Sequence, residues 1–243
     1  MKQSVFTTIV LVSTFVIGYI IFEFMLPEFI QKGGPLVVAL IALILMLTTF
    51  IFERIFSLRK AQGRGPITVF LKNIQQAINT SDIDAAIAAC DKQRGSCANI
   101  IRTGLEKYKT LVEEGDTKAQ RAVMEEVNHA IEEATMLEVP LLERNLVVLS
   151  TIASISTMVG LLGTVIGMIR AFAALARAGA PDAVQLSIGI SEALINTAGG
   201  IAGGIGGIVA YNFFVTKVDN FTYMIDEASY SIVQSLVTRK GKK

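Results

Sequence analysis

Three polar side chains lie close together in an apolar part of the chain, where they could take part in ion chemistry inside a membrane. Glu192, Asn196 and Thr197 supply a carboxylate, an amide and a hydroxyl, and six glycines follow within residues 199–207. A charged side chain at the centre of a bilayer costs about 2.5–3.5 kcal/mol on insertion scales. We therefore predict that Glu192 either faces a hydrated path and helps to pass a cation, or is a structural carboxylate, protonated or bonded to Asn196.

A second set of hydroxyls lies in the preceding apolar segment. Ser150, Ser154, Thr157 and Thr164 are separated by four, three and seven residues, which places them along one face of a helix. One carboxylate and a stripe of hydroxyls do not make a proton relay across a bilayer, because a second titratable group is missing. The chain therefore has the features of one half of an ion-conducting device.

Glycines at helical spacing predict close contact between the helices of both segments, because steps of four residues between glycines let two helix backbones approach. The residues that we assign to helix packing are Gly160, Gly163, Gly167, Gly199, Gly203 and Gly207. At 100° per residue, the last three share one helix sector with Glu192 and Asn196. Two hypotheses remain open. Either two helices pack tightly with nothing moving, or the glycines form a smooth face that can slide or rotate against a neighbour.

The composition is that of a membrane protein. Hydrophobic residues make up 52% of the 243 residues and charged residues 18%, whereas soluble domains are about a quarter charged. Apolar runs cover residues 4–26, 36–52, 146–176 and 184–215, and about 20 apolar residues span a bilayer. We predict an all-α integral membrane protein with three to four transmembrane helices, the first run being a retained span or an interfacial helix. A net charge of +1 without a basic patch argues against nucleic-acid binding.

Lysine and arginine residues collect after the second apolar run and at the C-terminus. Under the positive-inside rule both regions are cytoplasmic, so both termini lie inside and the polar region between the second and third runs is one cytoplasmic domain. The expected segments are an extra N-terminal span and short periplasmic loop (1–35), a span and its cytoplasmic exit (36–65), a cytoplasmic helical domain (66–145), two pore-lining spans (146–216), and a cytoplasmic C-terminal helix with a basic tail (217–243).

Local signals divide the cytoplasmic domain into helices. Pro66 is suited to the first turn of one helix, and Asp82 is suited to cap another over residues 83–93. Ser96 is placed to begin a third helix. A fourth, long helix follows without glycines, bends at Pro140, and is expected to run unbroken into the third span.

Other residues that could carry chemistry are discounted. His129 is the only histidine and lies among glutamates on a helix face that we interpret as solvated, and Cys90 and Cys97 lack CxxC spacing. The glycines at 199–207 are not followed by the Gly-Lys-Ser/Thr of a phosphate loop. We predict no enzyme activity, no metal and no resident cofactor.

Two motifs resemble one family. Residues 160–172, GLLGTVIGMIRAF, resemble the GLxGTVxGxxxxF signature of the ExbB/TolQ/MotA proton-channel family, and residues 192–198, EALINTA, resemble its EALxxTA motif. Both stand in the family's order and separation, and the likeness is greatest to ExbB. The chain departs from the family at Gly206, where members usually have proline, and in its extra first span.

The resemblance implies the missing half of the device. Family members form a ring, typically a homopentamer, around an ExbD/TolR-type single-span partner, typically a dimer, which carries a proton-binding aspartate. By the same resemblance Thr164 and Thr197 line the pore opposite that aspartate, and Glu192 matches the family glutamate. From their place among the polar residues of the two spans, we also assign Asn196 and Thr157 to the ion pathway. The resemblance also implies that the ion is H⁺ or Na⁺, that the chain lies in the bacterial inner membrane, and that the motion passes to a TonB-type protein. The alternatives are a TolQ-like, gliding or flagellar-stator role, and a non-conducting membrane scaffold.

Overall fold

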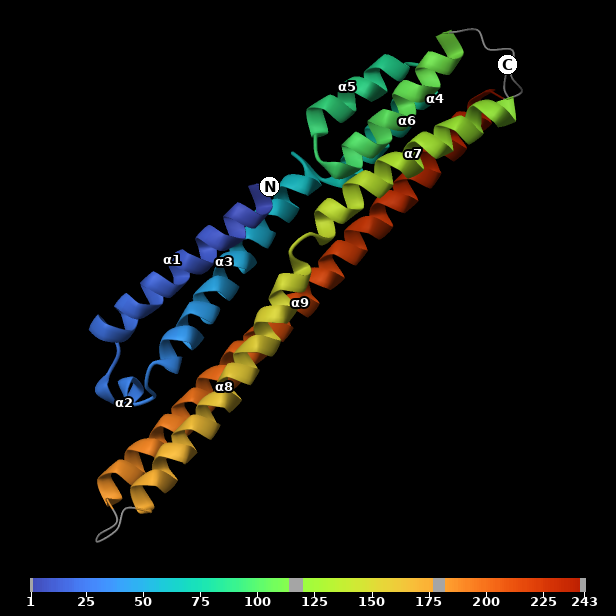
Figure 1. Ribbon diagram of the computed structural model, residues 1–243. Coiled ribbons are helices and arrows are strands. Elements are labelled where there is room, and N and C mark those ends of the chain that lie inside the picture. The colour runs from blue at the N-terminus through green and yellow to red at the C-terminus, as the bar shows by residue number, and fades with distance from the viewer. Residues whose placement is uncertain (1, 114–119, 177–181, 241–243) are drawn as a thin grey trace. The chain divides into compact units, whose positions relative to one another are not determined.

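The computed structural model describes residues 2–113, 120–176 and 182–240, and every regular element in these ranges is a helix (Figure 1). This confirms the all-α prediction. The helices are α1 (Lys2–Phe24), α2 (Glu28–Gln31), α3 (Leu36–Gln62), α4 (Ile67–Asn79), α5 (Ile83–Gln93), α6 (Ser96–Glu113), α7 (Gln120–Glu143), α8 (Leu146–Leu175) and α9 (Ala183–Lys240). They form two compact units: Met1–Arg54 with Asn145–Phe214, and Ile55–Arg144 with Val215–Lys243.

Three helical stretches are long and apolar enough to cross a membrane: Leu36–Asn79, Arg121–Leu175 and Ala183–Thr238. Their apolar runs lie in α3, α8 and α9. The extra N-terminal helix α1 has 23 residues, about 35 Å of helix at 1.5 Å per residue. It packs closely on α3, because a Cβ added at Gly18 would lie 3.2 Å from the Val38 carbonyl oxygen. Its role as a fourth span stays a prediction.

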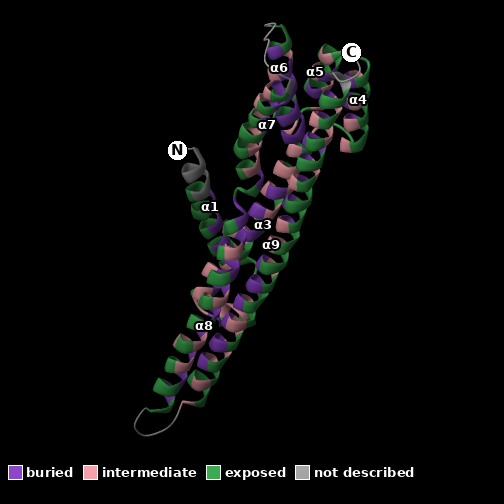
Figure 2. Ribbon diagram, turned by 90° about the vertical axis from the view of Figure 1, so that its right-hand side faces the viewer, coloured by how far each residue is buried: buried purple, intermediate pink, exposed green. Residues whose placement is uncertain are grey.

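In the first unit, α8 and α9 run side by side and bury the residues on their facing sides (Figure 2). One buried ion pair lies at the end of this unit. Arg54 is 1% exposed, and its Nη2 lies 2.7 Å from Oε1 of its neighbour Glu53. The Asn145 side-chain amide donates to the other Glu53 oxygen at 3.3 Å. The end of the apolar run of α3 is thereby tied to the beginning of α8.

The second unit contains α4 to α7 and the last part of α9, and its local signals behave as predicted. Pro66 is the N-cap of α4. The Asp82 carboxylate accepts a hydrogen bond from the Ala85 amide at 2.8 Å, so α5 begins and ends where the sequence predicts. Helix α5 stops at Arg94 and Gly95, both with positive φ, and α6 begins at Ser96.

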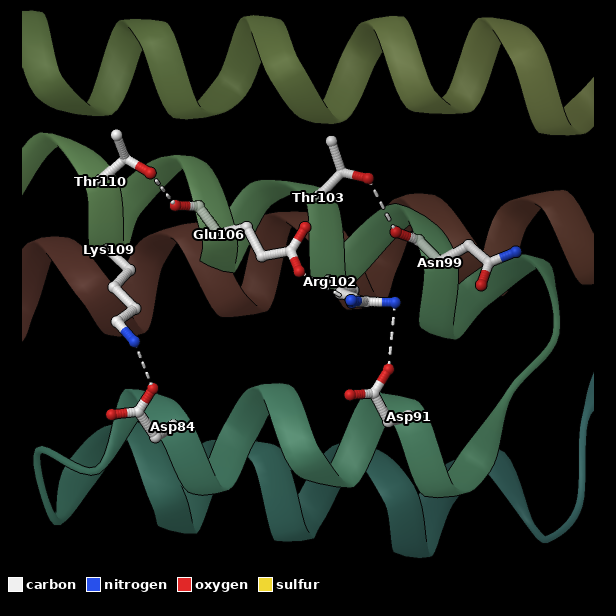
Figure 3. Close-up of polar contacts among 8 residues, drawn as sticks. All are labelled: Asp84, Asp91, Asn99, Arg102, Thr103, Glu106, Lys109 and Thr110. Carbon is white, nitrogen blue, oxygen red and sulfur yellow. Dashed lines mark hydrogen bonds and ion pairs between the residues drawn. The ribbon is translucent and has the colours of Figure 1, made fainter.

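Helices α5 and α6 are joined by ion pairs as well as by their apolar faces (Figure 3). Nζ of Lys109 lies 2.7 Å from Asp84, and Nη1 of Arg102 lies 3.1 Å from Asp91. All four side chains are more than a third exposed, so solvent screens both pairs and they contribute little to stability. The stability of this hairpin therefore rests mainly on its buried apolar residues.

The expectation of one unbroken helix from the cytoplasmic domain into the third span is wrong. Pro140 lies inside α7, which continues to Glu143, and the interruption comes at Asn145, whose φ is 65°. Asparagine adopts this left-handed conformation more readily than most residues. Helix α8 begins at Leu146. Because Asn145 also bonds to Glu53, a contact distant in sequence accompanies the break, and no proline or glycine marks it.

The two thiols give a pH prediction. Cys90 and Cys97 are 2% and 3% exposed, and burial raises the pKa of each from its ordinary value of 9.0 to about 12. Between pH 9 and 12 the folded chain keeps protons that the unfolded chain loses. The free energy of unfolding should therefore fall as pH rises through this window, by about 1.4 kcal/mol per pH unit for each thiol.

Thermal unfolding in detergent from pH 8 to 11 tests this, together with alkylation by iodoacetamide. The native thiols should resist alkylation at pH 10, and the Cys90→Ala/Cys97→Ala variant should show a weaker pH dependence. Equal slopes in the two proteins would contradict the prediction.

Candidate ion-pathway site

The site is built on an unusually close approach of α8 to α9. A Cβ added at Gly200 would lie 2.6 Å from the Gly160 Cα, and one added at Gly160 would lie 2.9 Å from the Gly200 Cα. A second close approach joins Gly167 and Gly189, where an added Cβ would lie 2.6 Å from the opposing carbonyl oxygen. Real Cβ atoms essentially never come within 3.0 Å of such atoms. The two backbones can therefore meet at these points only because the side chains are missing.

The other predicted packing glycines also contact helices of the same chain. Gly163 lies against the Asn196 side chain, Gly203 and Gly207 lie against Ser156 and Ala153 of α8, and Gly199 lies against Leu40 of α3. These contacts support the hypothesis of tight packing. The alternative, a smooth face that can slide or rotate against a neighbour, stays a prediction.

Gly199 and Gly200 are neighbours in sequence but differ in how closely they are packed, which gives a stability prediction. Gly200→Ala forces a methyl group into the α8 backbone and should cost about 1–3 kcal/mol, whereas Gly199→Ala meets only the flexible end of Leu40 at 3.2 Å and should cost less. The measurement is the thermal midpoint in detergent, with Ala202→Val on the exposed side of α9 as the control. Equal midpoints for the two glycine variants would show that α8 and α9 are not this close.

The two predicted pore threonines meet between the helices. Oγ1 of Thr164 on α8 is hydrogen-bonded to Oγ1 of Thr197 on α9, and both side chains are half-buried. Each hydroxyl also lies within reach of a carbonyl of its own helix, that of Gly160 at 3.3 Å and that of Ala193 at 3.0 Å. Each hydroxyl has one hydrogen to donate and two lone pairs that can accept, so the threonine pair keeps lone pairs that another donor can use.

The remaining predicted hydroxyls do not join this pair. Oγ1 of Thr157 bonds to the Ala153 carbonyl oxygen at 3.2 Å and lies against Gly204, and the hydroxyls of Ser150 and Ser154 bond to carbonyls of their own helix. Hydroxyls bonded in this way add no free donor. Of the predicted row of hydroxyls on α8, only that of Thr164 therefore bonds to a side chain of α9, that of Thr197.

Glu192 is buried in an ion pair that the sequence analysis missed. Its two carboxylate oxygens each lie 2.6 Å from Nη1 of Arg170, and the Glu192 side chain is 3% exposed. The loop before α3 covers it, because a Cβ added at Gly34 would lie 2.6 Å from Oε1. Gly34 has φ 73°, which favours glycine there in addition to the lack of space. The sequence signal was a second charge within an apolar segment, but it did not show that the two charges pair.

Asn196 fastens the same loop to α9. Its Nδ2 donates to the Gly33 carbonyl at 2.7 Å and to the Glu192 backbone carbonyl at 2.9 Å. The expected bond between Asn196 and the Glu192 carboxylate is therefore replaced by the pair with Arg170. Oδ1 of Asn196 has no hydrogen-bond partner among the described residues, and neither has Oγ of Ser156. Ser156 was not predicted from the sequence. Two buried polar atoms thus remain unsatisfied at the contact of α8 and α9.

His129 does not belong to this site. Its Nδ1 lies 3.9 Å from Oε1 of Glu133, and both side chains are about 70% exposed. In the part of the chain that the structure describes, no group of three or more histidine, cysteine, aspartate or glutamate residues is placed to hold a metal ion.

Closely packed apolar helices with a polar contact between them define an all-helical membrane protein with a candidate ion pathway. Its sequence matches the MotA/TolQ/ExbB proton channel family over residues 92–227, more than half of the chain. The chain belongs to this family, and the resemblance of its two motifs is confirmed.

Relatives from both the TolQ and the ExbB groups are similar to the chain. The Tol-Pal system protein TolQ of Pseudomonas aeruginosa is 30% identical over 191 residues, which cover 76% of this chain and 81% of that protein. The biopolymer transport protein ExbB of Pseudomonas putida is 23% identical over 207 residues, covering 85% of this chain and 62% of that protein. TolQ of Haemophilus influenzae is 33% identical over 120 residues, 49% of this chain and 52% of that protein.

Proposed function

We propose that the chain is an ExbB-like subunit of an inner-membrane motor driven by the proton-motive force. The observation that supports this most directly is that the polar groups between the helices have different partners. Thr164 and Thr197 form a contact with acceptor capacity to spare, while the carboxylate of Glu192 is already paired with Arg170. In this proposal the titrating group for ion transfer comes from another polypeptide.

In this proposal the subunits form a ring, typically of five, around an ExbD/TolR-type partner whose single span carries the titrating aspartate. Protons, or sodium ions, pass between that aspartate and the threonine pair. The resulting motion energises TonB-dependent transport across an outer membrane. The cytoplasmic helices stiffen the ring and extend it below the membrane.

The experiment is co-expression of this chain with a small single-span protein that carries an aspartate in its span, sought first in the neighbouring reading frames. We expect the two to copurify, and liposomes containing both to dissipate a pH gradient only while the partner's aspartate is intact. Repeating the assay with a sodium gradient identifies the ion. A pure homo-oligomer that never binds a single-span protein and conducts neither ion would instead indicate a non-conducting scaffold.

A second candidate is a TolQ-like role, favoured by the 30% identity to TolQ of Pseudomonas aeruginosa over 76% of the chain. The two roles differ in the protein that receives the motion. Expression with its own partner in bacteria that lack ExbB or TolQ separates them: restored uptake through outer-membrane receptors supports the ExbB-like role, and restored envelope integrity supports the TolQ-like role.

A further inference from the structure

A cavity of about 570 Å³ lies in the second unit, between the last turn of α3, the turn from α5 to α6, and the end of α7. Lys60, Arg64 and Arg94 contribute three cations to its wall. All three are exposed, and none of them forms an ion pair with another described residue. The one carboxylate in the wall, Glu138, instead accepts a hydrogen bond from Asn99 at 2.9 Å. The cavity therefore has an excess of positive charge.

The fold holds two of these arginines near each other, although they are 30 positions apart in sequence. The Arg64 amide donates to the Gln93 carbonyl at 2.8 Å, and Nε2 of Gln93 donates back to the Gly65 carbonyl at 3.0 Å. The turns also meet at glycines, since a Cβ added at Gly95 would lie 2.8 Å from the Gly63 nitrogen. These backbone contacts place Arg64 and Arg94 in one cavity wall, where both positive charges can attract the same anion.

The surroundings indicate what kind of anion fits. Lys60 follows the apolar run of α3 by only eight residues, so the sequence places the cavity's cations just beyond a membrane span. Leu141 in the cavity wall is 54% exposed, and Leu137, one turn earlier on α7, is 74% exposed. A phosphate group beside apolar surface is the chemistry of a phospholipid headgroup, and basic residues at the cytoplasmic edge of a span bind anionic lipids. The start of α6 at Ser96, in the same wall, adds the partial positive charge of a helix N-terminus.

We propose that this cavity binds the phosphate headgroup of an anionic phospholipid of the inner leaflet. Arg64 and Arg94 contact the phosphate, Lys60 approaches it from α3, and the acyl chains lie along the exposed leucines of α7. Bound lipid would compensate for the excess charge and fix the exit of α3. This site does not depend on ion conduction, so its test is independent of the proposed function.

The test uses the full chain in nanodiscs of phosphatidylcholine with a minor fraction of phosphatidylglycerol. We measure the phosphatidylglycerol that remains bound after extraction into detergent, and its effect on the thermal midpoint. Arg64→Gln/Arg94→Gln should lower the affinity about fivefold for each arginine removed. Arg64→Lys/Arg94→Lys, which keeps the charge, should retain most of the binding and shows that the site can be altered without unfolding.

The matched control is Arg59→Gln/Arg144→Gln, which removes two exposed arginines outside the cavity. Equal loss of lipid in this control would overturn the proposal, because binding would then depend only on total charge. Inorganic phosphate and glycerol phosphate serve as soluble probes. If either raises the thermal midpoint as much as phosphatidylglycerol, or if the glutamine variant keeps its lipid, the assignment to a lipid headgroup is wrong.

Discussion

Thr164→Val and Thr197→Val should each reduce ion flux, measured with the partner protein in liposomes, to the level of liposomes without protein. Valine keeps the shape of threonine and deletes its hydroxyl, so the change removes the hydrogen-bonding group of a contact that joins α8 to α9. A typical hydrogen bond contributes about 0.5–1.5 kcal/mol to stability. The variants should therefore stay folded and keep their oligomeric state while losing transport.

The double variant should lose no more flux than either single variant, because groups that act as a unit are not additive. Thr164→Ser should retain flux, since the hydroxyl remains. Thr151→Val on α8 is the matched control: its hydroxyl is exposed and bonds only to the Val147 carbonyl of its own helix, at 2.8 Å. Full flux in both valine variants would favour the scaffold over the motor.

The second large effect is expected at the ion pair of Arg170 and Glu192. Arg170→Leu should lower the free energy of unfolding by about 2–4 kcal/mol, because removing one partner of a buried pair leaves the other charge uncompensated. Arg170 itself is 54% exposed, so the pair is only partly enclosed and the expected loss is below that of a fully buried pair. The uncompensated charge is then that of the Glu192 carboxylate, which is enclosed by α8, α9 and the loop at Gly34.

A double-mutant cycle distinguishes this from a general packing defect. Arg170→Leu/Glu192→Gln removes both charges, and its loss of stability should be smaller than the sum of the two single losses. The control is Arg102→Leu, which breaks exposed pairs with Asp91 and Glu106 and should cost about 1 kcal/mol or less. Strict additivity of the single losses would show that Arg170 and Glu192 do not interact.

Features that depend on neighbouring residues could be predicted from the sequence. The bounds of α5 follow from the Asp82 cap and the Arg94-Gly95 stop, and α4 begins after Pro66 as expected. The glycine spacing identified most of the residues that lie where α8 and α9 meet, because helical periodicity places them on one face. The residues assigned to helix packing did not include Gly189 and Gly200, and they included Gly199, which lies against α3. Both motifs of the family lie in these two helices, so the family could also be predicted.

Features that depend on residues distant in sequence could not be predicted. Arg170 and Glu192 are 22 residues apart on different helices, and Gly33 and Asn196 are 163 apart. Periodicity states which residues share a face, but not which helix or loop lies opposite that face. For the same reason the break at Asn145 was missed, since the residue that bonds to it, Glu53, is 92 positions away.

The sequence by itself determined the class of protein, the helices and the polar residues inside the membrane, because composition, capping and spacing act over a few turns of chain. Only the tertiary structure decided how the polar groups are shared. It brings Thr164 into contact with Thr197, and it pairs Glu192 with Arg170 beneath the Gly34 loop. The physical reason is that a buried charge or hydroxyl is stabilised by whichever partner the packing brings within about 3 Å, and glycine-to-glycine contact of α8 and α9 sets that distance.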